Sequence, residues 1–197
     1  MEFYRIWQRC LVAMPLFLTI VGSAINVSAR PAAVFLPHLE RIQSSLPLGL
    51  AMRLPTAIPL SGHSDIEESQ LVVRVFPSET PQRFTVGVFT CDRSSHPCLL
   101  GSFSVENETT ASATRDLGRH QEKGDRISLG TNIEGYLIEG PRQNPSYQFS
   151  TIMWQQNDMI YTISFPAFER ENIILMATSM ARQDPLSRTV SSSAPSP

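Results

Sequence analysis

The sequence predicts an α+β protein with a single domain, in which a curved antiparallel β-sheet packs against an N-terminal and a C-terminal helix. Apolar and polar residues alternate with a period of two through most of residues 70–166, which is typical of half-buried strands. Apolar residues at helical spacing occur instead near the two ends of the chain. The chain beyond residue 29 is long enough for one domain with a hydrophobic core.

Residues 1–29 have the pattern of a secretory signal peptide. Two arginines precede an uncharged apolar run at 11–22, and small residues follow it. This pattern predicts cleavage between Ala29 and Arg30, and therefore an exported protein, either periplasmic or extracellular. An uncleaved membrane anchor is the alternative, but the run is interrupted by Pro15 and is shorter than the ~20 residues that cross a bilayer. We expect no stable membrane span after cleavage.

The domain is predicted to cover residues 30–183 and to begin with a short helix at 33–46. The apolar residues at helical spacing in this segment are Phe35, Leu39, Ile42 and Leu46. Residues 48–60 contain two prolines, which predict an edge strand followed by an extended passage. Residues 61–70 are polar, and we expect a loop there.

Three strands follow, at residues 70–77, 83–91 and 98–106, each with apolar residues on one face. Cys91 ends the second strand and Cys98 begins the third. Antiparallel neighbours bring such positions within disulfide reach.

The cysteine pair is therefore interpreted as a disulfide between Cys91 and Cys98, which is favoured in an exported protein. A metal site and a redox pair are the alternatives. The spacing does not match the Cys-x-x-Cys motif, and His96 is the one histidine between the two cysteines that could serve as a further metal ligand.

The second half of the sheet is predicted to follow a long solvated connection at 106–125, where Leu117 is the one large apolar residue. Strands are expected at 126–130 and 134–140. Two further strands, at 146–154 and 159–166, are separated by four polar residues with turn chemistry and form the clearest hairpin of the sequence.

A helix is predicted at 169–182, followed by a disordered tail rich in Ser and Pro at 184–197. The apolar stripe of the helix is Ile173, Met176, Ala177 and Met180. Ala177 is small enough to let the helix lie close to the sheet. Trp154 and Tyr161 are expected to pair across the hairpin. These four side chains, Trp154, Tyr161, Ala177 and Met180, are therefore assigned to packing.

The C-terminal hairpin and helix contain a pattern that can be written W-x6-Y-x-I…E-x-I-I-L-M-A-x-S-M, starting at Trp154. Upstream, residues 54–59 read LPTAIP. Together these segments resemble the DUF4367-type domains of exported or membrane-tethered bacterial envelope proteins. The resemblance covers about a quarter of the chain and implies an envelope α+β domain, without catalytic residues to carry over. The cysteine hairpin departs from that pattern.

The composition excludes several function classes. The formal net charge of −2 lacks the basic field that nucleic acid would require. The sequence contains no GxSxG, HExxH or SxxK motif and no phosphate-binding glycine loop, so we expect no catalytic residue and no cofactor. The histidines have no metal-ligand spacing, so no metal is expected. They are His38, His63, His96 and His120.

Three hypotheses about function follow. The first is a non-enzymatic accessory or interaction domain with an envelope protein as its partner. The second is a carrier or sensor of an apolar ligand, lined by methionines. The candidate methionines are Met52, Met153, Met159, Met176 and Met180. The third is an exported hydrolase whose residues come from His63, Asp65, Asp92 and His96; the segment 62–65 combines Gly, His, Ser and Asp, but we interpret it as a polar loop.

Overall fold

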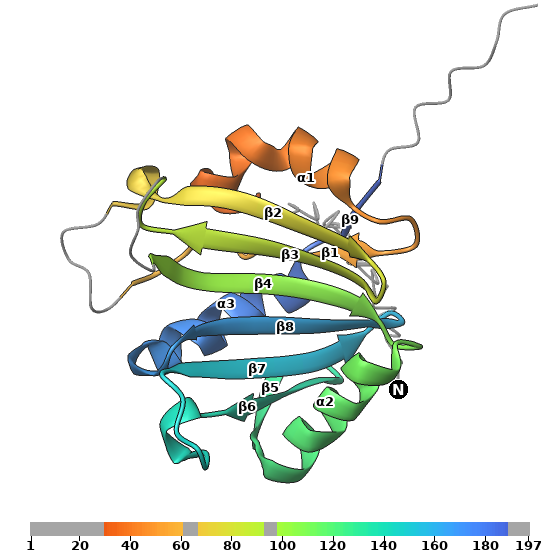
Figure 1. The fold of residues 1–197 in the computed structure, drawn as a ribbon, viewed down its shortest axis with the longest axis vertical. Coiled ribbons are helices and arrows are strands. Elements are labelled where there is room, and N and C mark those ends of the chain that lie inside the picture. Colours follow the sequence, from red (N-terminus) through yellow and green to blue (C-terminus); the bar gives the residue numbers. More distant parts are fainter. Residues whose placement is uncertain (1–29, 61–66, 93–97, 189–197) are drawn as a thin grey trace, which may run out of the picture.

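The computed structural model describes residues 30–60, 67–92 and 98–188 and shows a mixed α+β fold (Figure 1). Seven antiparallel strands form one open sheet in the order β2-β3-β4-β8-β7-β6-β5. The strands are β2 (Val72–Glu79), β3 (Gln82–Phe89), β4 (Leu99–Asn107), β5 (Asp125–Gly130), β6 (Ile133–Ile138), β7 (Phe149–Gln156) and β8 (Met159–Pro166). The predicted signal peptide lies outside the described residues.

The chain reaches the far edge of the sheet through helix α2 (Ala111–Lys123). Strand β4 ends in the middle of the sheet, α2 crosses three strand positions, and β5 begins at the edge. The chain then returns through β6 and β7 until β8 pairs with β4. The position where α2 ends and β5 begins is therefore a junction between a helix and a sheet edge.

The two faces of the sheet are covered differently. On one face lie the 3-10 helix η1 (Ala33–His38), helix α1 (Leu39–Ser45) and helix α3 (Arg170–Arg182), whose apolar side chains share the main hydrophobic cluster with the sheet. Phe35 of η1, for example, packs edge-on against Phe103, with ring centroids 5.8 Å apart. The other face carries α2, which Figure 1 shows in front of the sheet, with α3 behind. A separate small cluster packs α2 against β7 and β8.

Most of the predicted elements are confirmed. All seven strands of the main sheet lie within three residues of their predicted bounds, and β8 has the predicted bounds. The N-terminal helix is divided into η1 and α1, with Pro37 inside η1. None of the helices in the described parts of the chain has the length and apolar character needed to cross a membrane.

The predicted solvated connection at 106–125 is wrong, because most of it forms α2. The buried side of this helix consists of Ala113, Leu117 and His120. These positions have helical spacing, but one side chain is small and one is polar, so counting large apolar residues missed the stripe.

The predicted tail is also wrong at its beginning. Strand β9 (Leu186–Ser187) pairs with β1 (Ala51–Met52) in a separate two-stranded sheet. The strand expected within 48–60 is therefore limited to β1, and its partner comes from the other end of the chain. Residues 189–197 lie outside the described residues.

Candidate functional site

A cavity of about 310 Å³ with both charged and aliphatic residues in its lining lies beside the C-terminal end of α2. It forms where three stretches of chain meet: the end of α2 with the start of β5, the end of β6, and the 3-10 helix η3 (Gly140–Arg142) with the residues after it. Its lining residues are Arg119, Lys123, Asp125, Leu137, Ile138, Glu139, Arg142, Gln143 and Asn144. We refer to it below as the α2 cavity.

Two glycines allow these segments to approach one another. Gly124 separates α2 from β5, and a Cβ atom there would lie 2.6 Å from the His120 carbonyl oxygen and 2.9 Å from that of Leu137. Gly140 begins η3, and a Cβ atom there would overlap backbone carbonyl oxygens of the segment leading into β7. Its amide donates instead to Ser150 Oγ at 3.2 Å. Side chains larger than hydrogen at these positions would push the walls of the α2 cavity apart.

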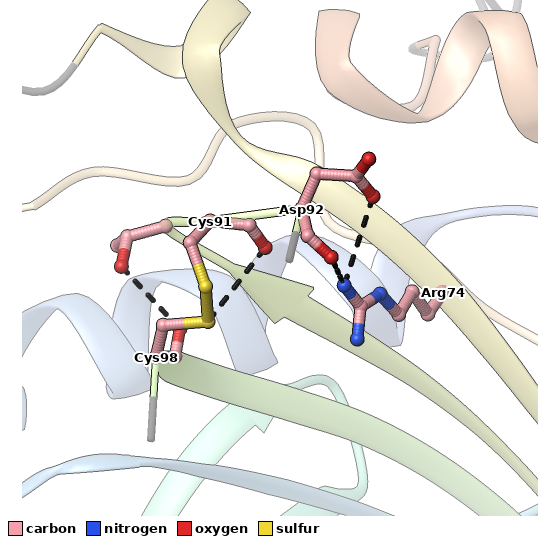
Figure 2. The surroundings of a disulfide bond; sticks show 5 residues. Arg74, Cys91, Asp92 and Cys98 are labelled. Atoms are coloured by element: carbon pink, nitrogen blue, oxygen red, sulfur yellow. Dashed lines mark hydrogen bonds and ion pairs between the residues drawn. A yellow bond between two sulfur atoms is a disulfide. The ribbon is translucent and has the colours of Figure 1, made fainter. Parts of the chain in front are cut away.

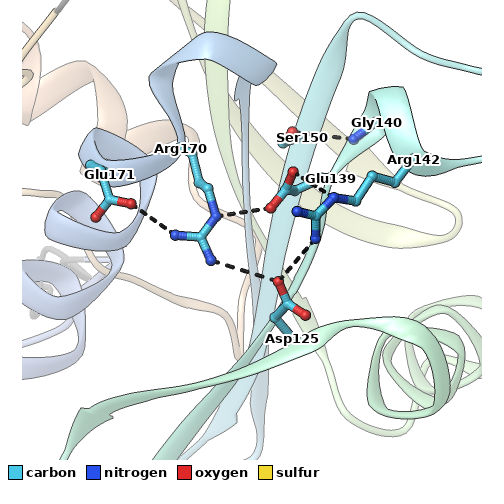
Figure 3. A network of polar contacts seen from close by, with 7 residues as sticks. All are labelled: Asp125, Glu139, Gly140, Arg142, Ser150, Arg170 and Glu171. Carbon is cyan, nitrogen blue, oxygen red and sulfur yellow. Dashed lines mark hydrogen bonds and ion pairs between the residues drawn. The ribbon is translucent and has the colours of Figure 1, made fainter.

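The carboxylates of the α2 cavity are held in a ring of ion pairs (Figure 3). Glu139 lies 3.2 Å from Arg142 and 2.9 Å from Arg170. Asp125 lies 3.7 Å from Arg142 and 3.6 Å from Arg170. Arg170, at the start of α3, also contacts Glu171 at 2.8 Å. The hydrogen bond to Glu139, followed by that to Glu171, raises the pKa of Arg170.

Two cations on α2 complete the lining. Arg119 and Lys123 are four residues apart, so they lie on the same side of the helix. The Arg119 side chain is 55 % exposed, and among the described residues its one ion-pair partner is Asp116, at 3.7 Å. Lys123 has no ion pair with any described residue. These two cations therefore have the fewest ion pairs among the charged side chains of the α2 cavity.

His120 lies next to these cations but points into the protein. Its Nδ1 is 2.9 Å from the Asp116 carbonyl oxygen and its Nε2 is 2.9 Å from Thr151 Oγ1. A carbonyl can only accept, so Nδ1 carries the proton and Nε2 accepts from the Thr151 hydroxyl. Burial lowers the pKa of His120, which keeps the ring neutral. Its role is to attach α2 to β7.

The cysteine hairpin, in which residues 91–98 join β3 to β4, is the second candidate region indicated by the sequence (Figure 2). The predicted disulfide is confirmed: Cys91 and Cys98 are bonded, with Cα atoms 5.9 Å apart, between the end of β3 and the start of β4. Arg74 of β2 donates to the Asp92 carbonyl oxygen and lies 3.7 Å from its carboxylate. Asp92 is thus held by β2 and is 73 % exposed at its side chain.

Of the four residues considered for a hydrolase, Asp92 is the one that the structure describes. His63, Asp65 and His96 lie outside the described residues, so no arrangement of the four can be described. Within the described ranges, no three side chains of His, Cys, Asp or Glu come together in a way that could hold a metal ion.

The residues assigned to packing and the candidate methionines lie in the interior. Trp154 and Tyr161 face each other across the β7–β8 hairpin and stack, with ring centroids 5.2 Å apart and an interplanar angle of 19°. Ala177 and Met180 are fully buried. The five methionines are buried in the two hydrophobic clusters: Met52, Met159, Met176 and Met180 in the main one and Met153 in that under α2.

The α2 cavity was not predicted from the sequence, although one local signal is present. Arg119 and Lys123 have helical i, i+4 spacing and precede a glycine in a segment that was interpreted as a loop. No family model, no curated protein and no solved structure matches this chain. The geometry of the α2 cavity is therefore the basis for inferring what the cavity can bind.

Proposed function

We propose that the protein is an exported bacterial envelope protein, and that it acts as a non-enzymatic accessory domain that binds a partner or ligand. Export is supported by the signal pattern of residues 1–29. It is also supported by the Cys91–Cys98 disulfide, because such bonds persist in oxidising compartments outside the cytosol. The resemblance of the C-terminal hairpin and helix to DUF4367-type envelope domains points in the same direction.

The observation that carries the binding proposal is the chemistry of the α2 cavity. Its volume of about 310 Å³ is at the lower end of the range typical of small-molecule sites. Its lining contains charged, amide and aliphatic side chains but no Ser, Thr, Cys or His. Each of the two carboxylates already forms ion pairs with two guanidinium groups. These groups can recognise and orient a molecule, whereas the lining offers no hydroxyl, thiol or imidazole group for a nucleophile–base pair.

Mass spectrometry of the protein from its own host tests this proposal. The full-length gene product would be isolated from the envelope and medium fractions and measured natively and after denaturation. We expect a mature mass that begins at Arg30 and lacks two hydrogens, with a reproducible non-covalent adduct, small molecule or protein, that denaturation removes.

Two results would contradict the proposal. An uncleaved, fully reduced chain recovered from the cytosol would contradict export. Conversion of the adduct into a second species by the purified protein would contradict a non-enzymatic role. A Cys91→Ser/Cys98→Ser variant provides the mass control, because it cannot lose the two hydrogens.

A further inference from the structure

We propose that the α2 cavity binds a small anionic molecule, with a carboxylate or phosphate group on a compact, partly apolar body. The inference rests on the proposed binding function and specifies the class of ligand. Its basis is the placement of Arg119, Lys123 and Arg142 around one cavity whose own carboxylates are already paired.

The charge balance of the walls favours an anion. The lining contains three cationic and two anionic side chains. The guanidinium group of Arg170, which lies outside the lining, forms ion pairs with both carboxylates. Asp125 and Glu139 are thus compensated before any ligand enters. A cationic ligand would have to displace an arginine from these carboxylates. An anionic ligand can instead form ion pairs with the two cations of α2, Arg119 and Lys123, which are the least paired charges of the lining.

The cations of α2 exceed what the helix itself requires. Carbonyl groups at the C-terminal end of a helix attract a positive side chain in its last turn, which accounts for Lys123. Arg119 lies one turn earlier, and its pair with Asp116 is a 3.7 Å contact between exposed groups, which contributes little to stability. Arg142 comes from η3, a different segment. Three cations from two segments can hold an anionic group from more than one side, with guanidinium forks for its oxygens.

The remaining lining defines the body of the ligand. Ile138, at the end of β6, contributes an aliphatic side chain to the lining, whereas the buried Leu137 side chain belongs to the main hydrophobic cluster. Gln143 and Asn144 follow η3 and offer amide donors and acceptors. A cavity of about 310 Å³ suits a compact molecule rather than a polymer. Phenyl phosphate and benzoate have this combination of an anionic group and a small apolar body.

Calorimetric titration of the purified, oxidised mature protein at low ionic strength tests the proposal. The probes are phenyl phosphate, benzoate, inorganic phosphate and benzylammonium. We expect saturable binding of phenyl phosphate, benzoate or both, at least threefold tighter than inorganic phosphate, and no binding of benzylammonium. The stronger of the first two probes distinguishes a phosphate ligand from a carboxylate ligand. Benzylammonium binding as tightly as the anions would overturn the proposal.

Matched variants place the binding at the α2 cavity. Arg119→Gln and Lys123→Gln should each raise the Kd of the best probe about tenfold or more, because each loses one charge-assisted contact. Arg115→Gln, on the same helix but outside the cavity lining, should leave the Kd within twofold. An equal rise in Kd in Arg115→Gln would overturn the proposal, because the affinity would then depend on the net charge of the protein and not on the α2 cavity.

Failure of this inference differs from failure of the proposed function. If no anionic probe binds, while protein from the host retains its adduct in both Arg119→Gln and Lys123→Gln, the α2 cavity is not the site but the protein still binds a partner or ligand. If protein from the host carries no adduct and no probe binds, both proposals are overturned.

Discussion

Arg170 Nε donates a hydrogen bond to Glu139 Oε1 over 2.9 Å and thereby attaches the first residue of α3 to the residue that follows β6 (Figure 3). Helix α3 covers one face of the sheet, and the α2 cavity lies beside the helix on the other face. Arg170 does not line the cavity, but it holds both of its carboxylates. The charge of the cavity therefore depends on an element that packs on the opposite side of the protein.

Replacement of Arg170 by methionine should lower the free energy of unfolding by about 1 kcal/mol, because partly exposed charged hydrogen bonds are lost. It should also weaken anion binding, since Asp125 and Glu139 would share Arg142 alone. Urea denaturation and calorimetric titration measure the two effects. Arg182→Met, at the other end of α3, is the control and should leave the Kd unchanged. Unaltered anion affinity in Arg170→Met would show that the ion-pair ring does not set the charge of the cavity.

Two glycine substitutions in one segment should have opposite effects. Gly124→Ala would place a methyl group 2.6 Å and 2.9 Å from two backbone carbonyl oxygens, and we expect a loss of about 1–3 kcal/mol in urea denaturation. Gly118 lies within α2, and a Cβ atom there meets nothing within 4 Å. Gly118→Ala should therefore stabilise the protein by about 0.5–1 kcal/mol through helix propensity. Equal stability of Gly124→Ala and the wild type would contradict the close approach of Gly124 to the His120 and Leu137 carbonyl oxygens.

The buried His120 should make stability depend on pH. Burial lowers its pKa in the folded protein, and the charge of Arg119 adds to the lowering, against a smaller opposite effect of the Asp116 carbonyl and carboxylate. The unfolded chain takes up a proton near pH 6.5, whereas the folded chain does so only at lower pH. The stabilising contribution is thus complete above about pH 6.5 and is lost as the pH falls below that value.

Urea denaturation at pH 7.5 and pH 5.5 measures this effect as the difference between the wild type and His120→Gln. We expect the wild type to lose more stability over this interval than the variant. His38→Gln, in η1, is the matched control and should retain the wild-type difference. The same pH dependence in the wild type and in His120→Gln would assign it to other groups.

Removal of the disulfide should weaken the protein without unfolding it. The Cys91–Cys98 bond closes a short ring at one end of the β3–β4 hairpin, and such rings contribute about 2–3 kcal/mol in the loop-entropy model. Cys91→Ser/Cys98→Ser should therefore melt several degrees lower and keep its circular dichroism spectrum. Addition of dithiothreitol should lower the melting temperature of the wild type to that of the variant. No difference under oxidising conditions would argue against a bond in solution.

The parts of the fold that sequence reasoning predicted are those with strong local patterns. Strand β8 is an example: Met159, Tyr161, Ile163 and Phe165 alternate and are all buried, so its bounds followed from the sequence. Helix α2 has equally regular spacing, but Ala113 and His120 occupy two of its buried positions. A pattern of large apolar residues cannot detect a helix that packs with a methyl group and a hydrogen-bonded imidazole.

The site could not be predicted because its parts are distant in the sequence. The cations of α2, the carboxylate of Glu139 and the guanidinium of Arg170 come together only through the return of the chain along β5 and β6. The pairing of β1 with β9 also depends on segments that are distant in the sequence. Two short strands from opposite ends of the domain pair with each other there. The i, i+4 spacing of Arg119 and Lys123 is a local signal, but no local pattern indicates which distant segments these residues meet.

The most direct test of an anion site is a ¹⁵N–¹H correlation spectrum of the oxidised protein, recorded during separate titrations with phenyl phosphate and with benzoate. We expect saturable shifts with at least one probe, confined to the amides of residues 119–125 and 137–144, which border the α2 cavity. In Lys123→Gln the same shifts should require about tenfold more of the probe. Shifts centred on the β2–β3 hairpin or the cysteine hairpin, or no shifts with either probe at millimolar concentration, would contradict an anion site at the α2 cavity.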